Sequence, residues 1–237
     1  MLRDNSSFRP SRIEDEDIET VSYEEPVLVS AQKECGRDYR VIIVNDVHAF
    51  AVVDCYRSVM KLNGKIVLGT EVLFEIFFRD NVILVASAKN NISEYLLDRS
   101  AKLLVSSFRC SLVLILDGLK IPGSVEISEK LRYICTDEGD WLDFSSACEE
   151  LEIGSVVRGF TASMICACES RQISCLAVLC VRDASYSIEI AQRFQLLWSS
   201  INKYLEISDP ITPPRMTFYH SMFKKDAFLS NTENMYT

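Results

Sequence analysis

The run Arg40-Val41-Ile42-Ile43-Val44-Asn45 decides the fold class of this 237-residue chain. Four apolar residues follow one another, and a polar residue stands at each end. A strand with one face in water would alternate apolar and polar residues, so an unbroken run predicts a strand buried on both faces. The stretch from Val47 to Met60 then shows helical spacing, and Lys61-Leu62-Asn63-Gly64 is expected to stop that helix. A central strand followed by a helix predicts an α/β domain.

The rest of the domain continues in the same way. Apolar runs at 71–78 and 82–86, separated by Arg79-Asp80-Asn81, predict two strands joined by a tight turn. The other expected elements are a strand at 65–68, a helix at 93–105 capped by Asn91, a strand at 112–116 ended by Asp117-Gly118, a short apolar run at 131–135, a helix at 155–170, a strand at 173–181 and a helix at 187–205.

The composition limits the kinds of partner. The chain is 48% hydrophobic and 25% charged, which fits one large globular domain. A net charge of −9 opposes binding to nucleic acid or to an anionic membrane surface, since such proteins present basic faces. No leader and no apolar run of about 20 residues is found, so we expect a cytoplasmic protein, with the nucleus as a further location. The nine cysteines fit reduced thiols.

Two tails are expected to flank the domain. Residues 1–25 are acidic, with Glu14-Asp15-Glu16-Asp17 at their centre, and lack a sustained apolar period. Such a segment cannot offset its ordering entropy, and an acidic docking arm is the functional alternative. Residues 208–237 begin with the helix-breaking pairs Asp209-Pro210 and Pro213-Pro214 and hold little apolar periodicity. We therefore expect an α/β domain at 26–207 between an acidic N-terminal tail and a flexible C-terminal tail.

The long connection at 117–155 is the least regular part of the domain. It contains Pro122-Gly123 and the acidic run Asp137-Glu138-Gly139-Asp140. A long connection after a strand is where an α/β protein often keeps its site or its partner surface. We expect a partner surface here.

Motifs for catalysis or metal binding are scarce. The chain has no phosphate-binding glycine loop and no nucleophile elbow, and His48 and His220 are its only histidines. Cys166, Cys168, Cys175 and Cys180 could supply four thiolates for zinc, but their spacing on a helix and a strand turns them to different faces. We expect them to pack in the core. The sequence thus predicts no catalytic residue, no cofactor and no metal.

The last three residues, Met235-Tyr236-Thr237, have the character of a ligand for another protein. A tyrosine can bury about 150 to 250 Å² while its hydroxyl stays paired. A terminal carboxylate is an anion that amines or backbone amides of a partner can bind. A three-residue pattern is weak by itself, and the rest of the chain must support it.

One segment carries a family resemblance. The stretch from Gly159 through Cys168, GFTASMICAC, leads into the apolar run from Ile173 to Val181. A helix of small residues followed by a strand with cysteines resembles the proteasome assembly chaperone 1 family. The strand at 40–45, the strand at 112–116 and the ending Met235-Tyr236-Thr237 extend the resemblance, and the match is patchy between 60 and 155.

The resemblance implies both a fold and a function. The fold would be a three-layer α/β/α sandwich, related to phosphorylase and hydrolase folds, without a catalytic site. The protein would pair with proteasome assembly chaperone 2 and assist assembly of the 20S proteasome alpha ring. Met235, Tyr236 and Thr237 match the hydrophobic-tyrosine-any ending of the family, which would enter a pocket between alpha subunits.

Two alternatives stay open. One is an α/β enzyme of the phosphorylase or hydrolase type, with its site in the Asp117 to Asp140 loop. It would require clustered titratable groups with shifted pKa values at the ends of the strands at 40–45 and 112–116. The other is a generic interaction domain whose ending is accidental.

Overall fold

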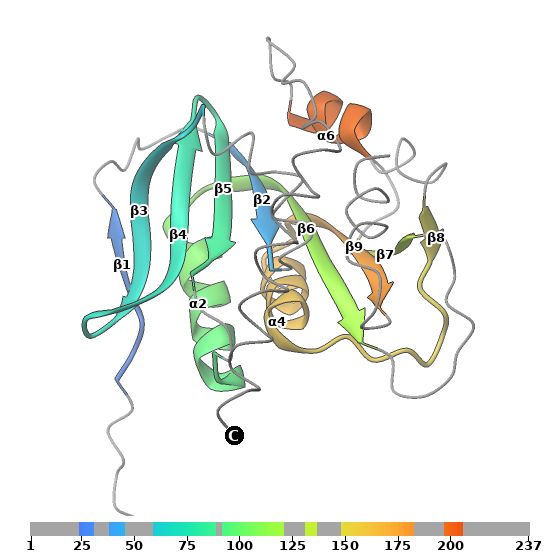
Figure 1. The fold of residues 1–237 in the computed structure, drawn as a ribbon, viewed down its shortest axis with the longest axis horizontal. Helices are drawn as coiled ribbons and strands as arrows, with labels where there is room; N and C mark the ends of the chain where they lie inside the picture. The colour runs from blue at the N-terminus through green and yellow to red at the C-terminus, as the bar shows by residue number, and fades with distance from the viewer. Residues whose placement is uncertain are drawn as a thin grey trace, which may run out of the picture.

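The computed structural model describes residues 24–30, 38–45, 59–88, 92–120, 131–136, 148–182 and 197–205. These residues form one nine-stranded mixed sheet with helices against it (Figure 1). Its strand order is β1-β3-β4-β5-β2-β6-β9-β7-β8. The elements are β1 (Val27–Ser30), β2 (Tyr39–Val44), β3 (Lys61–Leu68), β4 (Glu71–Arg79), β5 (Val82–Ser87), α2 (Glu94–Ser107), β6 (Cys110–Lys120), β7 (Leu131–Cys135), β8 (Cys148–Glu150), α4 (Gly159–Glu169), β9 (Ser174–Arg182) and α6 (Trp198–Leu205).

Strand β2 occupies the centre of the sheet. It pairs in parallel with β5 on one side and β6 on the other, so that Ile42 lies between Leu84 and Leu114. Every residue from Val41 to Val44 is at most 3% exposed. Successive side chains of a strand point to opposite faces, so both faces of β2 are covered. The prediction of a central strand buried on both sides is confirmed.

Parallel strands β5, β2, β6 and β9 form the middle of the sheet, and antiparallel strands extend it on both sides. On one side, β3 and β4 continue from β5, and β1 forms the edge. The turn between β4 and β5 contains Asp80 at φ 53°, a left-handed conformation that aspartate tolerates better than most residues. On the other side, β7 pairs antiparallel with β9, and β8 follows. The expected hairpin of 71–78 and 82–86 is confirmed.

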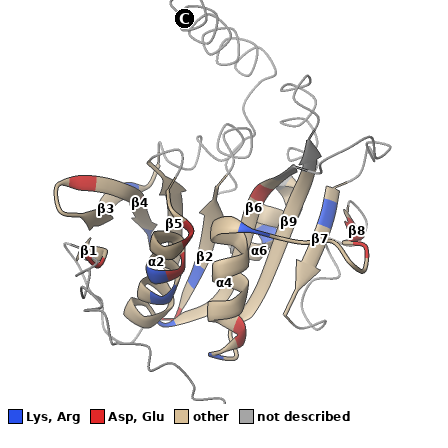
Figure 2. Cartoon of the chain, turned by 90° about the horizontal axis from the view of Figure 1, so that it is seen from below, with Lys and Arg blue, Asp and Glu red and all other residues tan. Residues whose placement is uncertain are grey.

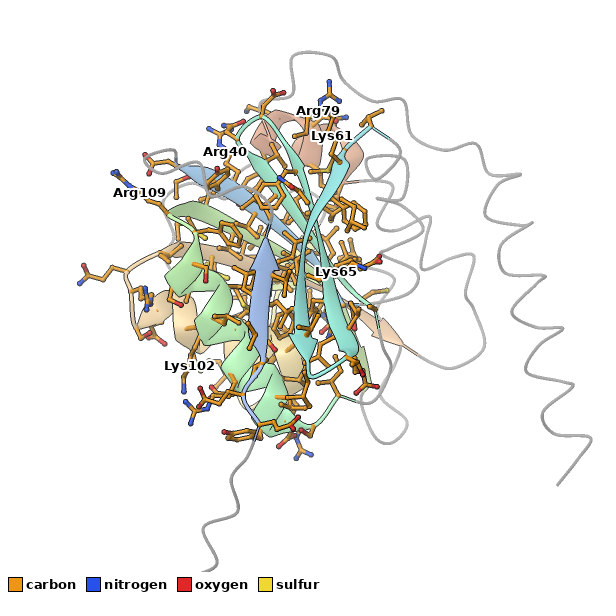
Figure 3. The ribbon with its side chains drawn as sticks, turned by 90° about the vertical axis from the view of Figure 1, so that its left-hand side faces the viewer. Arg40, Lys61, Lys65, Arg79, Lys102 and Arg109 are labelled. Atoms are coloured by element: carbon orange, nitrogen blue, oxygen red, sulfur yellow. The ribbon has the colours of Figure 1, made fainter. Side chains whose placement is uncertain are left out.

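Helices cover both faces of the parallel strands. Helices α2 and α4 pack beside each other on one face (Figure 2). Their buried residues join one cluster with Val41, Ile43 and Val113. The alternate residues Ile42, Val44 and Leu114 are buried outside that cluster, as are Leu197 and Ile201 of the α6 region. Figure 3 shows α6 across the sheet from α2. The α/β fold with three layers is as predicted.

Two contacts fix the layers to the sheet. The ring of Phe74 on β4 stacks on the ring of Phe160 at the start of α4, with centroids 4.3 Å apart. The guanidinium of Arg40 donates a hydrogen bond of 2.6 Å to the backbone oxygen of Tyr204, which ties α6 to the beginning of β2. None of the helices in the described ranges is both long and apolar enough to span a bilayer.

Several predicted boundaries are wrong. Strand β3 begins at Lys61 and pairs with β4 from there, where a start at 65 was predicted. The helix that Lys61 to Gly64 were expected to stop falls on residues that are largely not described. Asp117-Gly118 does not end its strand, because β6 continues to Lys120 in register with β9. Helix α4 begins at Gly159, where 155 was predicted. Asn91 is not the cap of α2, since Ser93 holds that position.

Other predictions are incomplete or lie outside the described residues. The short edge strands β1 and β8 were not predicted. The helices expected at 47–60 and 187–205 fall largely on residues that are not described, and of the second only α6 is seen. The expected tails at 1–25 and 208–237 also lie outside the described residues, except for Glu24 and Glu25.

The Ser100 hydroxyl on α2 yields a prediction about stability. Ser100 is 0% exposed, and among the described residues its Oγ has no hydrogen-bond partner. A buried hydroxyl without a partner lowers stability, and alanine favours helix more than serine does. We expect Ser100→Ala to leave the free energy of unfolding unchanged or to raise it by about 1 kcal/mol, as measured by urea denaturation. The neighbouring change Ala101→Ser adds such a hydroxyl and should be destabilising. A clear loss of stability in Ser100→Ala would contradict this account.

Candidate functional site

A buried polar cluster lies where the parallel strands end. Asn45 directly follows β2, Asp117 lies near the end of β6, and Thr161 is in the first turn of α4. The two strands are neighbours and parallel, and the amide of Asn45 donates a 3.1 Å bond to the carbonyl oxygen of Leu116. Carboxyl ends of parallel strands are the usual place for a site in an α/β protein. This cluster, Asn45, Asp117 and Thr161, is therefore the candidate site of the described body.

The carboxylate of Asp117 accepts three hydrogen bonds from the chain itself. Its Oδ2 accepts one from the Thr161 hydroxyl at 2.5 Å and one from Asn45 Nδ2 at 3.2 Å. Its Oδ1 accepts one from the backbone amide of Gly118 at 2.7 Å. These bonds join β2, β6 and α4 at one point. They also explain how a carboxylate can lie inside a continuing strand.

Asp117 is the one carboxylate that is buried within the described ranges, at 8% exposed. Burial raises the pKa of Asp117 above its ordinary value, and the hydrogen bonds from Thr161, Asn45 and Gly118 act in the opposite direction. A raised pKa of a carboxyl group at the end of a parallel strand is one part of the signal that the enzyme alternative required, which was a cluster of such groups.

The surroundings of Asp117 lack the other groups that the enzyme alternative would need within the described ranges. Both carboxylate oxygens are engaged by donors from the chain, and within the described ranges no second titratable group with a shifted pKa contacts it. The arrangement therefore acts as a polar tie between a strand and a helix. His48 and His220 lie outside the described residues.

The cysteines are mostly core residues. Cys168, Cys175 and Cys180 are 0% exposed, as predicted, whereas Cys166 is exposed on the outer side of α4 and the prediction was wrong there. Burial raises the pKa of the thiols of Cys110 and Cys148 to about 12, so both stay protonated at neutral pH. Across the part of the chain that the structure describes, His, Cys, Asp and Glu form no group of three that could hold a metal.

The predicted partner-binding residues Met235, Tyr236 and Thr237 lie outside the described residues, so the structure does not place them. Sequence reasoning missed the roles of Asn45 and Thr161. A usable signal was present: an aspartate at the end of an apolar run, followed later by a hydroxyl in the first turn of a helix.

Comparisons with known proteins bear on the fold. No family model matches the sequence, and no curated protein sequence does either. Among solved structures, the chain resembles Pyrococcus furiosus PbaB, described as an archaeal proteasome activator. The TM-score is 0.61 and the identity 13%, over 89% of this chain and 100% of that one.

Two further structures share the arrangement. Pyrococcus furiosus PbaA, described as an archaeal homolog of proteasome-assembly chaperone, matches 84% of this chain and 94% of its own, with TM-score 0.59 and 14% identity. A PAC2 family protein from Streptomyces avermitilis matches 80% of this chain and 95% of its own, with TM-score 0.50 and 9% identity. At such identities, the likeness establishes a shared fold.

The Thr161 bond can be tested by a matched pair of substitutions. Thr161→Val keeps the size of the side chain and removes the donor to Asp117, and should lower the free energy of unfolding by about 1.5 to 3 kcal/mol. Thr161→Ser keeps the donor and removes one methyl group, and should cost about 1 kcal/mol. Urea denaturation measures both. Equal losses in the two variants would show that the hydroxyl bond contributes nothing.

The pH dependence of stability tests the state of Asp117. Its folded pKa is raised, so its contribution to stability is complete below the unfolded pKa and is lost as pH rises through the folded pKa. Asp117→Asn has no such titration. The stability of the parent protein relative to Asp117→Asn should therefore increase as pH falls from about 7 to about 4, measured by urea denaturation. A relative stability that decreases over this range would mean that the hydrogen bonds outweigh burial.

Proposed function

We propose that the chain is a non-enzymatic chaperone for assembly of the 20S proteasome alpha ring. The observation that carries the proposal is its fold, which matches PbaA and PbaB over 84% and 89% of the chain. The descriptions of those proteins name proteasome assembly and proteasome activation. The chain would work in the cytoplasm or the nucleus, paired with a related chaperone of the proteasome assembly chaperone 2 type.

The three hydrogen bonds to the Asp117 carboxylate support a binding protein over an enzyme. A general acid or base must reach a substrate proton, and here the chain's own donors occupy both carboxylate oxygens. The body then serves as a rigid platform. Contacts with the alpha ring would come from its surface and from its C-terminal residues.

We further propose that Met235, Tyr236 and Thr237 enter a pocket between neighbouring alpha subunits. Burying Met235 and Tyr236 would yield about 5 to 8 kcal/mol from apolar area. Association and ordering of a tail cost a comparable amount. The tail alone would therefore bind weakly, and a second contact on the body would make its insertion effectively intramolecular.

Substitution at Tyr236 tests this mode. Tyr236→Ala should weaken binding to purified 20S proteasome by about 30-fold or more, the loss expected for an interface residue worth about 2 kcal/mol. Tyr236→Phe retains the ring and should bind nearly as well as the parent. One glycine added after Thr237 displaces the carboxylate and should also weaken binding. Surface plasmon resonance gives the affinities, and circular dichroism confirms the fold.

The result for Tyr236→Ala separates two possibilities. Unchanged affinity would remove the C-terminal residues from the mechanism while leaving binding by the body possible. No binding by the parent protein would overturn the proposed function itself.

A further inference from the structure

The segment between β8 and α4, Leu151–Arg158, presents two apolar side chains to solvent. Ile153 is 107% exposed and Val156 is 64% exposed, the two highest values among the large apolar residues in the described ranges. Figure 1 shows this segment passing along the lower edge of the sheet, where β6 and β9 end. Single exposed apolar side chains are ordinary on a protein surface. Two such side chains, three residues apart on one connection, are less common and suggest a role at an interface.

The backbone that carries these side chains is held in place. The amide of Ser155 donates a 3.0 Å bond to the carbonyl oxygen of Glu152, which closes a turn with Ile153 at its apex. Gly154 adopts φ 93° in that turn, and a Cβ atom there would meet nothing within 4 Å. Backbone conformation, and not packing, therefore requires glycine at this position. The turn stands clear of the body while keeping a defined shape.

Strand β7 anchors the beginning of the segment. The amide of Leu151 donates a 2.8 Å bond to the carbonyl oxygen of Tyr133. The Arg132 guanidinium, only 17% exposed, bonds to Glu149 at 2.5 Å and to Glu152 at 3.5 Å. A side chain on a fixed turn loses less entropy on binding than one on a mobile loop. Ile153 is thus placed as an anchor residue is placed at an interface.

Charge indicates what kind of surface would receive the turn. Glu150 is exposed, and Glu152 is 73% exposed although its carboxylate lies 3.5 Å from the Arg132 guanidinium. Carboxylates therefore precede the apolar apex, and the exposed Arg158 follows it. The whole chain carries a net charge of −9. A second copy would bring the same carboxylates and the same net charge to the contact, which disfavours self-association. A complementary surface would have an apolar hollow, with lysine or arginine on the side that meets Glu150 and Glu152.

We propose that Ile153 and Val156 form a docking knob for a basic-rimmed apolar hollow on the surface of the proteasome alpha ring. The inference rests on the proposed function and supplies the second contact that weak insertion of the C-terminal residues requires. The knob holds the body on the ring, and the C-terminal residues then bind at a high effective concentration.

The test compares matched valine substitutions. Val156→Asp and Ile153→Asp place a carboxylate in the knob, whereas Val29→Asp alters a valine of similar exposure, 57%, on the edge strand β1 at the other end of the sheet. Binding to purified 20S proteasome is measured by surface plasmon resonance, with folding checked by circular dichroism. Each knob variant should lose about 10-fold or more in affinity, mainly through faster dissociation, and Val29→Asp should stay within about 2-fold.

A backbone variant provides an independent check. Gly154→Ala keeps both apolar side chains but strains the turn at its positive φ, and should also weaken binding. If the knob variants bind as the parent does while Tyr236→Ala loses affinity, the knob is overturned and the proposed function stands. Equal losses in Val29→Asp and Val156→Asp would overturn the knob as a specific site. No binding by the parent would overturn both proposals.

Discussion

The enclosure of β2 is the constraint on which the rest of the described structure depends. Its residues Val41 to Val44 have no face left for water, so the chain must supply a hydrogen-bonded strand on each side and a layer on each face. Helices α2 and α4 supply one layer, and α6 contributes to the other. The same parallel pairing brings Asn45 at the end of β2 beside Asp117 on β6.

An element can be predicted from the sequence when its own residues determine it, and not when contacts with distant segments determine it. The apolar runs of β2, β5 and β9 are visible in the sequence, because a strand buried on both faces consists almost wholly of apolar residues. All three strands were predicted. Asp117-Gly118 shows the opposite case: by local rules it ends a strand, but pairing with β9 and donors from distant segments keep the strand going. The edge strands β1 and β8 have only four and three residues, too few to show a period.

The candidate site also has one part that the local sequence shows and another that only the folded chain brings together. An aspartate after an apolar run is visible in the sequence, but its partners Asn45 and Thr161 are 72 and 44 residues away and meet it only in the folded chain. The exposure of Ile153 likewise depends on how Arg132 and Gly154 hold the turn. For the long connection at 117–155, the sequence allowed either a functional site or a partner surface, and a partner surface was predicted. The carboxylate of Asp117 is engaged by donors of the chain itself, and the turn at Ile153 exposes apolar side chains, which fits a partner surface better than a catalytic site.

Mass spectrometry of the proteins that co-purify with the chain from its native cell tests the central claim most directly, that this α/β body is a chaperone of the proteasome alpha ring. The account predicts proteasome alpha subunits and one related α/β protein in stoichiometric amounts. It also predicts loss of the alpha subunits, and retention of the related protein, when Tyr236 is replaced by alanine. A chain that purifies alone, or with neither alpha subunits nor a related α/β protein, would contradict it.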